Sequence, residues 1–373
     1  MKIGFVLDDS LDSTDGVQQY ILTLGKWLAC QNHEVHYLVG GTKRTDITNV
    51  HSLARNLTVK FNRNVLSIPT HSNKKQIKQL LKDQQFDILH VQLPFSPVLA
   101  GRIINLAPAK TRIVGTFHIL PYSKLQFIGT QILHWITNKS IKRFDKIISV
   151  SPAAKSFAKT AMGIESQVIP NAVDFTSFKV SSTKNNDSNI RIVFLGRLVQ
   201  RKGCMELLKA IDLLISNQKS LNLQVVIAGD GPDRKKLEQY VVAHNLAEII
   251  EFRGRISEEE KPKLLSSAEI VALPSISGES FGIVVVEAIA SGGGVVVGGK
   301  NPGYSFVLAK TPEVLFVPQD TVEFARLLLE LLHSEEKRKK LARIQKEAIK
   351  DFDVEVVGKQ ILEVYQSVIA KVN

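Results

Sequence analysis

The sequence predicts an α/β protein made of two doubly wound domains, each with a parallel sheet. Short apolar segments rich in β-branched residues alternate with helical patterns along the chain, which is typical of parallel strands covered by helices on both faces. The chain has 373 residues, enough for two domains of ordinary size. Its composition, 44% hydrophobic and 23% charged, is that of a globular protein with a full core.

The predicted strands fall into two series, separated by a predicted hinge near residues 168–175. The first series comprises Ile3–Leu7, Val35–Val39, Ile88–Val91, Arg112–Phe117 and Ile147–Val150. The second comprises Ile190–Leu195, Leu223–Ala228, Ile249–Phe252, Ile270–Leu273, Val295–Val297 and Leu315–Val317. We therefore predict domains over residues 1–168 and 172–353, followed by a C-terminal helix at about 354–373.

Charge and cysteine usage limit the class of protein. The formal net charge of +12 favours an anionic partner, either a nucleotide or lipid headgroups. Nucleic acid is not expected, because aromatic residues are only 7% of the chain and no basic stretch has interleaved aromatics. No apolar run approaches the roughly 20 residues that span a bilayer. Cys30 and Cys204 are far apart and form no CxxC, which favours reduced thiols in a cytoplasmic protein.

The segment 278–288 combines a glycine-bounded turn with an apolar run that is expected to be helical. A turn before a helix offers free N–H groups, which suit phosphate. Glu279 and Glu287 are eight positions apart and differ by about 80° in direction on a helix. Both carboxylates are therefore expected to face one ligand from different depths. An ordinary amphipathic helix with two solvated acids explains the pattern about equally well.

A basic glycine-bounded loop, Gly196–Gly203, follows the first strand of the second series. Its glycines allow close approach of a phosphate. Arg197 offers a planar fork for a diphosphate, and Lys202 offers a point charge. A plain basic loop is the alternative. No metal site is expected, because the acids that follow the first strand have no DxD or histidine partner.

His118 ends another strand at the rim where parallel sheets bind ligands. A lone histidine is more often structural, but this position favours function. At the first strand's end, Gln18 is a hydrogen-bonding candidate for an acceptor, and Thr14 or Asp15 are candidates for a plain helix cap.

A basic helix is predicted from Asn73, with lysines on one stripe and Ile77, Leu80 and Leu81 on the opposite face. This pattern suits an anionic bilayer surface, although a solvated surface helix explains it equally well. The apolar segment Phe127–Ile136 and the basic residues after it support a peripheral membrane protein. The membrane-facing candidates are Lys74, Lys75, Lys78 and Lys82.

Together these segments resemble the retaining glycosyltransferases of family 4, which have the GT-B fold of two Rossmann-like domains with a cleft between them. The resemblance covers essentially the whole chain. It rests on the E-x7-E pair Glu279 and Glu287, the G-R-x4-K-G loop at Gly196–Gly203, the turn Gly229–Pro232 and Thr116-Phe117-His118. In this family the C-terminal helix crosses back onto the first domain. Asp15 replaces the first of two glycines that the family usually has, while Gly16 keeps the second.

The resemblance implies a metal-independent enzyme without a cofactor that uses a nucleoside diphosphate sugar as co-substrate. It assigns Arg197 and Lys202 to the leaving diphosphate, Glu279 to the donor sugar and Glu287 to the ribose. His118 is assigned to the reaction centre, and it completes the predicted catalytic set with Arg197, Lys202 and Glu279. The predicted donor site comprises Gly16, Gly196, Arg197, Lys202, Arg255, Ile256, Glu279, Ser280, Phe281, Gly282, Ile283 and Glu287.

Within the family, the resemblance is greatest to members that transfer mannose to phosphatidylinositol at the inner face of the cell membrane. It implies GDP-mannose in preference to UDP-sugars, and a membrane lipid or glycolipid acceptor. The predicted acceptor contacts are Asp12, Gln18, Asn62, Arg63 and Arg201.

Alternative acceptors stay open, because the expected loop at 61–72 lacks a later arginine that these members have. The alternatives are diacylglycerol, a polyprenyl-linked glycan and a soluble polyol. A non-catalytic nucleotide-sugar-binding protein is a weaker alternative, because the set of charged site residues is intact. An NAD-dependent enzyme is weaker still, because Arg234 occupies the last position of a G-x-G-x-x-G fingerprint.

Overall fold

The computed structural model describes residues 1–13, 15–61, 64–121, 124–179, 189–218 and 221–370. The chain divides into two compact units. Unit 1 comprises Met1–Ala172 and Val354–Asn373, and unit 2 comprises Val173–Asp353. Among the described residues, no helix is both long enough and apolar enough to cross a membrane.

Unit 1 is built on a seven-stranded parallel sheet with the order β3-β2-β1-β6-β7-β8-β9. The order in which successive strands are added to the sheet reverses at β1, because β2 lies on one side of β1 and β6 lies on the other. The strands are β1 (Lys2–Leu7), β2 (Glu34–Val39), β3 (Val50–Ser52), β6 (Ile88–Leu93), β7 (Arg112–Phe117), β8 (Lys146–Ser149) and β9 (Gln167–Val168).

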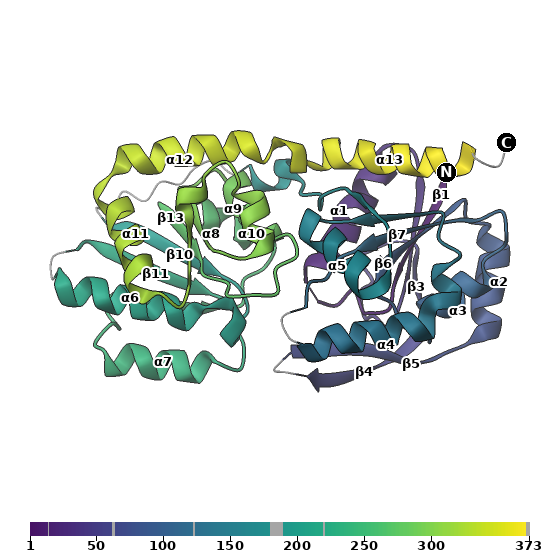
Figure 1. Cartoon of the computed structure of the whole chain (residues 1–373), viewed down its shortest axis with the longest axis horizontal. Coiled ribbons are helices and arrows are strands. Elements are labelled where there is room, and N and C mark those ends of the chain that lie inside the picture. The colour runs from purple at the N-terminus through teal and green to yellow at the C-terminus, as the bar shows by residue number, and fades with distance from the viewer. Residues whose placement is uncertain (14, 62–63, 122–123, 180–188, 219–220, 371–373) are drawn as a thin grey trace. The chain divides into compact units, whose positions relative to one another are not determined.

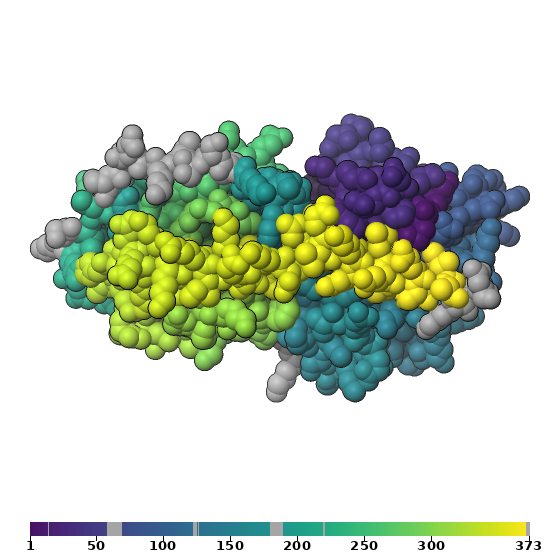
Figure 2. All heavy atoms as spheres, turned by 90° about the horizontal axis from the view of Figure 1, so that it is seen from above, coloured from purple at the N-terminus to yellow at the C-terminus, as the bar shows by residue number. Residues whose placement is uncertain are grey.

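The helices of unit 1 form two layers. Right-handed crossovers that run in opposite directions along the sheet place their helices on opposite faces. One layer contains α1 (Gly16–Cys30) and α13 (Val354–Ala370), which pack against each other; in Figure 2 the yellow C-terminal helix lies against purple N-terminal segments. In the other layer each helix contacts the next (Figure 1): α2 (Lys74–Gln84), α3 (Ala100–Leu106), α4 (Lys124–Ile141) and α5 (Pro152–Met162).

Unit 2 has a six-stranded parallel sheet with the order β12-β11-β10-β13-β14-β15. Its strands are β10 (Ile190–Leu195), β11 (Leu223–Ala228), β12 (Ile250–Gly254), β13 (Ile270–Leu273), β14 (Val295–Gly299) and β15 (Leu315–Phe316). Its α-helices are α6 (Cys204–Asn217), α7 (Arg234–Ala243), α8 (Glu260–Ser266), α9 (Ile283–Ala290), α10 (Pro302–Val307), α11 (Thr321–His333) and α12 (Glu335–Ala348).

The expectation of a loop over residues 61–72 is wrong for most of that segment. β4 (Ala54–Phe61) and β5 (Asn64–Ser72) form an antiparallel hairpin. The segment contains Val65, Ile68 and Thr70, whose β-branched side chains favour strands. Pro69 is opposite Asn56, where the register shifts, and such irregularities are where strands accommodate a residue without an N–H. The acceptor candidates Asn62 and Arg63 lie outside the described residues.

The glycine-rich segment around β14 has a packing explanation. A Cβ atom on Gly294 would lie 1.7 Å from the carbonyl oxygen of Glu269, and one on Gly293 would lie 2.4 Å from that of Leu265. The backbone of Gly293 and Gly294 therefore packs directly against the backbone of Leu265 and Glu269 where the chain enters β14. Only residues without a side chain allow this approach.

We expect Gly294→Ala to lower the free energy of unfolding of unit 2 by at least about 2 kcal/mol, because the backbone must shift to accept the methyl group. Gly196→Ala is the matched control, since its Cβ would make an ordinary 3.6 Å contact with Phe194. Urea denaturation followed by circular dichroism measures both variants. Equal midpoints for the two variants would rule out the packing explanation.

Candidate active site

The candidate donor site lies at the point in the sheet of unit 2 where the strand order reverses. β10 has β11 on one side and β13 on the other, so the loops that follow β10 and β13 diverge. Ligands of open parallel sheets bind in the crevice that such diverging loops leave at the strands' C-terminal ends. The two loops here are 196–203 and 274–282, which carry most of the predicted donor residues.

Three donors from these loops converge on one carboxylate oxygen. Oε1 of the buried Glu279 accepts from Lys202 Nζ at 2.7 Å and from Arg201 Nη1 at 3.2 Å. It also accepts from Ser275 Oγ at 2.8 Å. Burial raises the pKa of Glu279, but the charges of Lys202 and Arg201 outweigh it and the net shift is downward. Glu279 is therefore ionised and holds both cations in fixed positions.

Backbone contacts hold the two loops together. Ile276 N donates to the carbonyl of Arg201 at 2.8 Å, and Ser275 Oγ, which donates to Glu279, lies 3.2 Å from the same carbonyl oxygen. Gly203 has φ +73°, and a Cβ there would lie 1.9 Å from the carbonyl oxygen of Pro274. The glycine of the G-R-x4-K-G loop thus lets the cationic loop approach the loop of Glu279.

The second glutamate of the predicted pair has a different partner. Glu287 lies inside α9 and is buried, and Lys261 Nζ of α8 donates to its Oε1 at 3.0 Å. Burial raises the pKa of Glu287 in spite of this lysine. Burial also acts to lower the pKa of Lys261, but the carboxylates of Glu287 and Glu258 outweigh it and the net shift is upward. Lys261 was not predicted from the sequence, because its spacing from Glu287 is neither helical nor strand-like.

The remaining donor candidates of unit 2 lie at the same sheet edge, whereas Gly16 lies in unit 1. Gly196 and Arg197 directly follow β10, and Arg255 and Ile256 directly follow β12. Gly282 takes the N-cap position of α9 with φ +95°, and Ile283 is the first residue of that helix. Gly303 N donates to the carbonyl of Glu279 at 3.0 Å, which fixes the backbone of the glutamate from α10. Ser280 and Phe281 lie between Glu279 and the helix start.

The strand order of unit 1 has a corresponding reversal between β1 and β6. Asp8, directly after β1, accepts hydrogen bonds from the backbone N–H groups of Ser96 and Ala100 and so ties the two loops together. Burial raises the pKa of Asp8 to about 6, against these hydrogen bonds. Asp8 was not predicted as a site residue, although its place at the end of the first strand is a signal of this role.

The acceptor candidates of unit 1 are held by the loop after β1. Gln18 is buried in the first turn of α1, and its Nε2 donates to Asp9 Oδ2 at 3.3 Å and to the carbonyl of Ser10 at 3.1 Å. Asp12 accepts from Thr42 Oγ1 at 2.6 Å and from Lys43 N at 2.8 Å. Gly16 begins α1, and Asp15 occupies the N-cap position without a side-chain capping bond.

His118 follows β7 and is buried beside Gln92, whose Oε1 lies 2.8 Å from Nε2 of the imidazole. A carboxamide oxygen only accepts, so Nε2 carries the proton and Nδ1 is the acceptor nitrogen of the ring. Burial lowers the pKa of His118 to about 3. His118 is therefore a neutral hydrogen-bonding group that can accept from a sugar hydroxyl. Gln92 was missed in the sequence, although it lies near the end of the neighbouring strand.

A buried polar chain extends behind His118. His90 Nδ1 lies 2.7 Å from Tyr365 Oη of α13, and His90 Nε2 lies 2.6 Å from Thr116 Oγ1. Tyr20 Oη lies 3.5 Å from the same Thr116 oxygen, and its ring meets the His118 ring edge-on. The C-terminal helix therefore braces the two strands that carry Gln92 and His118.

The buried imidazoles predict a pH dependence of stability. Burial lowers the pKa of His90 from 6.5 to about 3, so only the unfolded chain gains this proton between pH 6.5 and 3. Its contribution is complete above pH 6.5 and is lost as the pH falls, by up to about 2 kcal/mol at pH 5. Asp8 acts in the opposite direction, because its folded pKa is raised. We therefore expect the wild-type protein to lose more stability from pH 7 to 5 than His90→Gln, as chemical denaturation at both pH values would measure. Identical pH slopes would contradict the neutral, buried state of His90.

The structure places the predicted residues in groups within each unit. Arg201, Lys202 and Glu279 are in direct contact, whereas Glu287 is paired with Lys261. In unit 1, Gln18 donates to Asp9 in the loop after β1, and Asp12 accepts from Thr42 in the loop after β2. His118 is hydrogen-bonded to Gln92. The membrane candidates form an exposed set along α2, whose helix begins after the N-cap Asn73: Lys74, Lys75, Lys78 and Lys82.

Comparisons with known families account for both units. Residues 175–348 match the family described as Glycosyl transferases group 1, and residues 14–177 match Glycosyltransferase Family 4. The phosphatidyl-myo-inositol mannosyltransferase of Mycolicibacterium smegmatis is 30% identical over 378 residues, which cover 99% of this chain and 94% of the relative. One component of the phosphatidylinositol N-acetylglucosaminyltransferase of Arabidopsis thaliana is 26% identical over 276 residues, 72% of this chain and 60% of that protein.

Solved structures confirm the predicted GT-B fold class. The Anabaena HepE structure in complex with UDP has a TM-score of 0.77 and 18% identity, and the match covers 98% of this chain and 100% of that one. A glycosyltransferase from Rickettsia africae also has a TM-score of 0.77 and 18% identity, with 99% of each chain covered. At these identities the likeness concerns the fold.

Proposed function

The chain belongs to the family 4 glycosyltransferases, and we propose that it transfers a hexose, with mannose favoured, from a nucleoside diphosphate sugar to a membrane lipid such as phosphatidylinositol. GDP-mannose is the favoured donor, and no further cofactor is required. The reaction retains the anomeric configuration of the sugar. The enzyme works in the cytoplasm, peripherally on the inner face of the cell membrane.

The observation that carries this proposal is the cation cluster around Glu279. Arg201 and Lys202 are held by one buried carboxylate, and Arg197 lies in the same loop. Two positive charges, those of Arg201 and Lys202, against the one negative charge of Glu279 leave an excess suited to a diphosphate. Because the cations are fixed before the donor arrives, they stabilise charge that develops on the leaving diphosphate without reorganising.

The proposed step breaks the bond between the sugar C1 and the diphosphate oxygen. The acceptor hydroxyl forms the new C1–O bond on the same face, and its proton passes to an oxygen of the departing nucleoside diphosphate. Lys202 and Arg197 neutralise that leaving group. Glu279 has a positioning role toward Lys202 and a binding role toward the donor sugar, and Glu287 is assigned to the ribose.

Unit 1 is proposed to supply the acceptor side. His118 is neutral and presents Nδ1 as an acceptor, which suits the orientation of a sugar hydroxyl rather than nucleophilic attack. Gln18, Asp12 and Arg201 are proposed contacts of the acceptor polyol.

Phosphatidylinositol is favoured because two relatives that are named for different sugars are both named for it. The Mycolicibacterium smegmatis relative is named as a mannosyltransferase, and the Arabidopsis thaliana relative as part of an N-acetylglucosaminyltransferase. The exposed lysines of α2 support an anionic membrane as the place of the reaction, because each lysine near such a surface contributes about 1 kcal/mol.

The test incubates the purified protein with labelled GDP-mannose, UDP-glucose or UDP-N-acetylglucosamine, each with and without vesicles that contain phosphatidylinositol. We expect label in the lipid phase from GDP-mannose only when phosphatidylinositol is present. Label in the lipid phase from one of the UDP-sugars would change the proposed sugar and base of the donor. Donor binding or hydrolysis without lipid product would move the acceptor to the alternatives, and the absence of binding to every donor would contradict the proposed donor site.

A further inference from the structure

Helix α4 exposes a stripe of large apolar side chains. Large apolar side chains at positions i, i+3, i+7, i+10 and i+11 point outward, with exposed fractions from 51% to 79%. They are Leu125, Ile128, Ile132, Trp135 and Ile136. The inward face carries the small buried polar residues Thr130, Thr137 and Ser140 beside Phe127, whose ring packs against Phe157 of α5.

The polar residues on the inner face are held by hydrogen bonds. Thr137 Oγ1 donates to the carbonyl of Leu133 at 2.7 Å, and Asn105 Nδ2 of α3 donates to Ser140 Oγ at 3.0 Å. The bond from α3 fixes the rotation of α4 with its apolar stripe outward. A contiguous exposed apolar patch of this kind marks a protein or membrane contact.

Charge selects an anionic bilayer as the occupant. From residue 88 to residue 144 the sequence contains no aspartate or glutamate and seven basic residues, and of these Arg112 is paired with Asp145. The other six are Arg102, Lys110, Lys124, Lys139, Lys142 and Arg143. Lys139 and Lys142 are exposed directly after the apolar stripe. An amphipathic helix with large apolar residues and flanking lysines lies in a membrane interface with its apolar face among the acyl chains.

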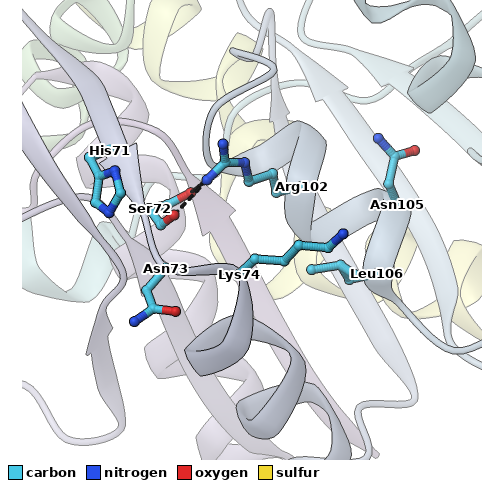
Figure 3. Close-up of a pocket in the computed structure, with 7 residues that line it drawn as sticks. All are labelled: His71, Ser72, Asn73, Lys74, Arg102, Asn105 and Leu106. Atoms are coloured by element: carbon cyan, nitrogen blue, oxygen red, sulfur yellow. Dashed lines mark hydrogen bonds between the residues drawn. The ribbon is translucent and has the colours of Figure 1, made fainter.

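The neighbouring helices of the same layer add a cationic hollow. Figure 3 shows Lys74 of α2 and Arg102 of α3 extending toward it, with His71 and Asn105 at its edges. The hollow has a volume of about 730 Å³, and Arg102 Nη1 is anchored by the carbonyl of Ser72 at 2.5 Å. Its size and charge suit a phosphate-bearing headgroup.

We propose that unit 1 docks on an anionic bilayer through the α2–α3–α4 layer, with the apolar stripe of α4 inserted among the acyl chains and the α2–α3 hollow receiving a headgroup. This inference rests on the proposed lipid acceptor and deepens it by naming the surface that reaches the lipid. The stripe supplies apolar insertion, and the lysines of α2 supply electrostatic attraction.

The chain has two tryptophans, and they report on this surface separately. Trp135 is 79% exposed in the stripe, and Trp27 is 6% exposed in the core. Adding phosphatidylcholine–phosphatidylinositol vesicles without any sugar donor should shift the tryptophan emission to the blue, and acyl-brominated lipid should quench it. Both changes should disappear in Trp135→Phe, which retains only Trp27.

Removal of the stripe should weaken vesicle binding, as co-sedimentation would measure. Loss of one large apolar contact changes a partition constant about tenfold, so Ile132→Ser with Trp135→Ser should weaken binding about a hundredfold. Val242→Ser with Val322→Ser is the matched control, because both valines are highly exposed in unit 2. Arg102→Gln should weaken binding to phosphatidylinositol vesicles without changing the blue shift at saturating lipid.

The outcomes separate this inference from the proposed function. Vesicle binding without a shift of Trp135 emission, or equal loss in the valine control, would overturn the assignment of α4. A dimer in light scattering that Ile132→Ser with Trp135→Ser dissociates would assign the stripe to a second copy instead. Because binding is measured without donor, failure of sugar transfer alone would count against the proposed function and leave the insertion result standing.

Discussion

Lys202→Ala is expected to lower the turnover of sugar transfer by about 10²- to 10³-fold, the range for loss of one preorganised electrostatic contact to a developing negative charge. Lys202 Nζ is held 2.7 Å from Glu279 Oε1, which keeps the ammonium in place before the donor binds. Steady-state kinetics with a saturating donor measure the turnover. The turnover reports on this contact because the contact acts most strongly on the charge of the leaving diphosphate.

The fold should survive this change, since Arg201 and Ser275 still donate to Glu279. The matched control is Lys209→Ala, which removes an exposed lysine from α6 of the same unit. Unchanged turnover in Lys202→Ala, with circular dichroism like that of the wild-type protein, would remove Lys202 from the diphosphate site.

Glu279→Ala is expected to lower the free energy of unfolding of unit 2 by about 3 kcal/mol and to abolish transfer. The change leaves two largely buried cations without their counter-charge, which is the costly way to break an ion pair. Glu279→Gln keeps the shape and one acceptor oxygen, so it should cost less stability but still lose turnover. Urea denaturation and kinetics of the two variants separate the structural role from the catalytic one.

The stabilising effect of Glu279 should also depend on pH. Its folded pKa is lowered, so its contribution is complete above the ordinary glutamate pKa of 4.5 and is lost as the pH falls below it. The stability difference between wild-type protein and Glu279→Ala should therefore shrink in acid. Glu313→Gln, which changes an exposed carboxylate of unit 2, is the control and should show no such trend. A constant difference down to about pH 3, well below the ordinary glutamate range, would contradict the ionised state of Glu279.

The fold could be predicted because its signals are local. The apolar segments that became β1, β7, β10 and β13 lie within one or two residues of their predicted bounds, since buried parallel strands read as continuous apolar runs. The hairpin of β4 and β5 was missed because Pro69 and several polar residues obscure its alternation. Its tolerance of proline depends on a register shift, which is set by the partner strand.

The site could be predicted in part for the same reason. Lys202 and Glu279 stand in motifs with fixed spacing, and the structure brings them into contact. The partners of other residues depend on tertiary packing across different elements. Lys261 beside Glu287, and Tyr365 behind His90, join residues far apart in the chain, so no spacing in one sequence reveals them.

The most direct test of the central claim is the product of the reaction with GDP-mannose and phosphatidylinositol vesicles. Mass spectrometry of the extracted lipid gives the mass added, and the one-bond carbon–hydrogen coupling at C1 of the sugar gives the anomer. The proposed mechanism predicts one added hexose in the α configuration of the donor. A β-linked product would contradict retention, and sugar that appears only in water while the lipid stays unmodified would contradict the proposed acceptor.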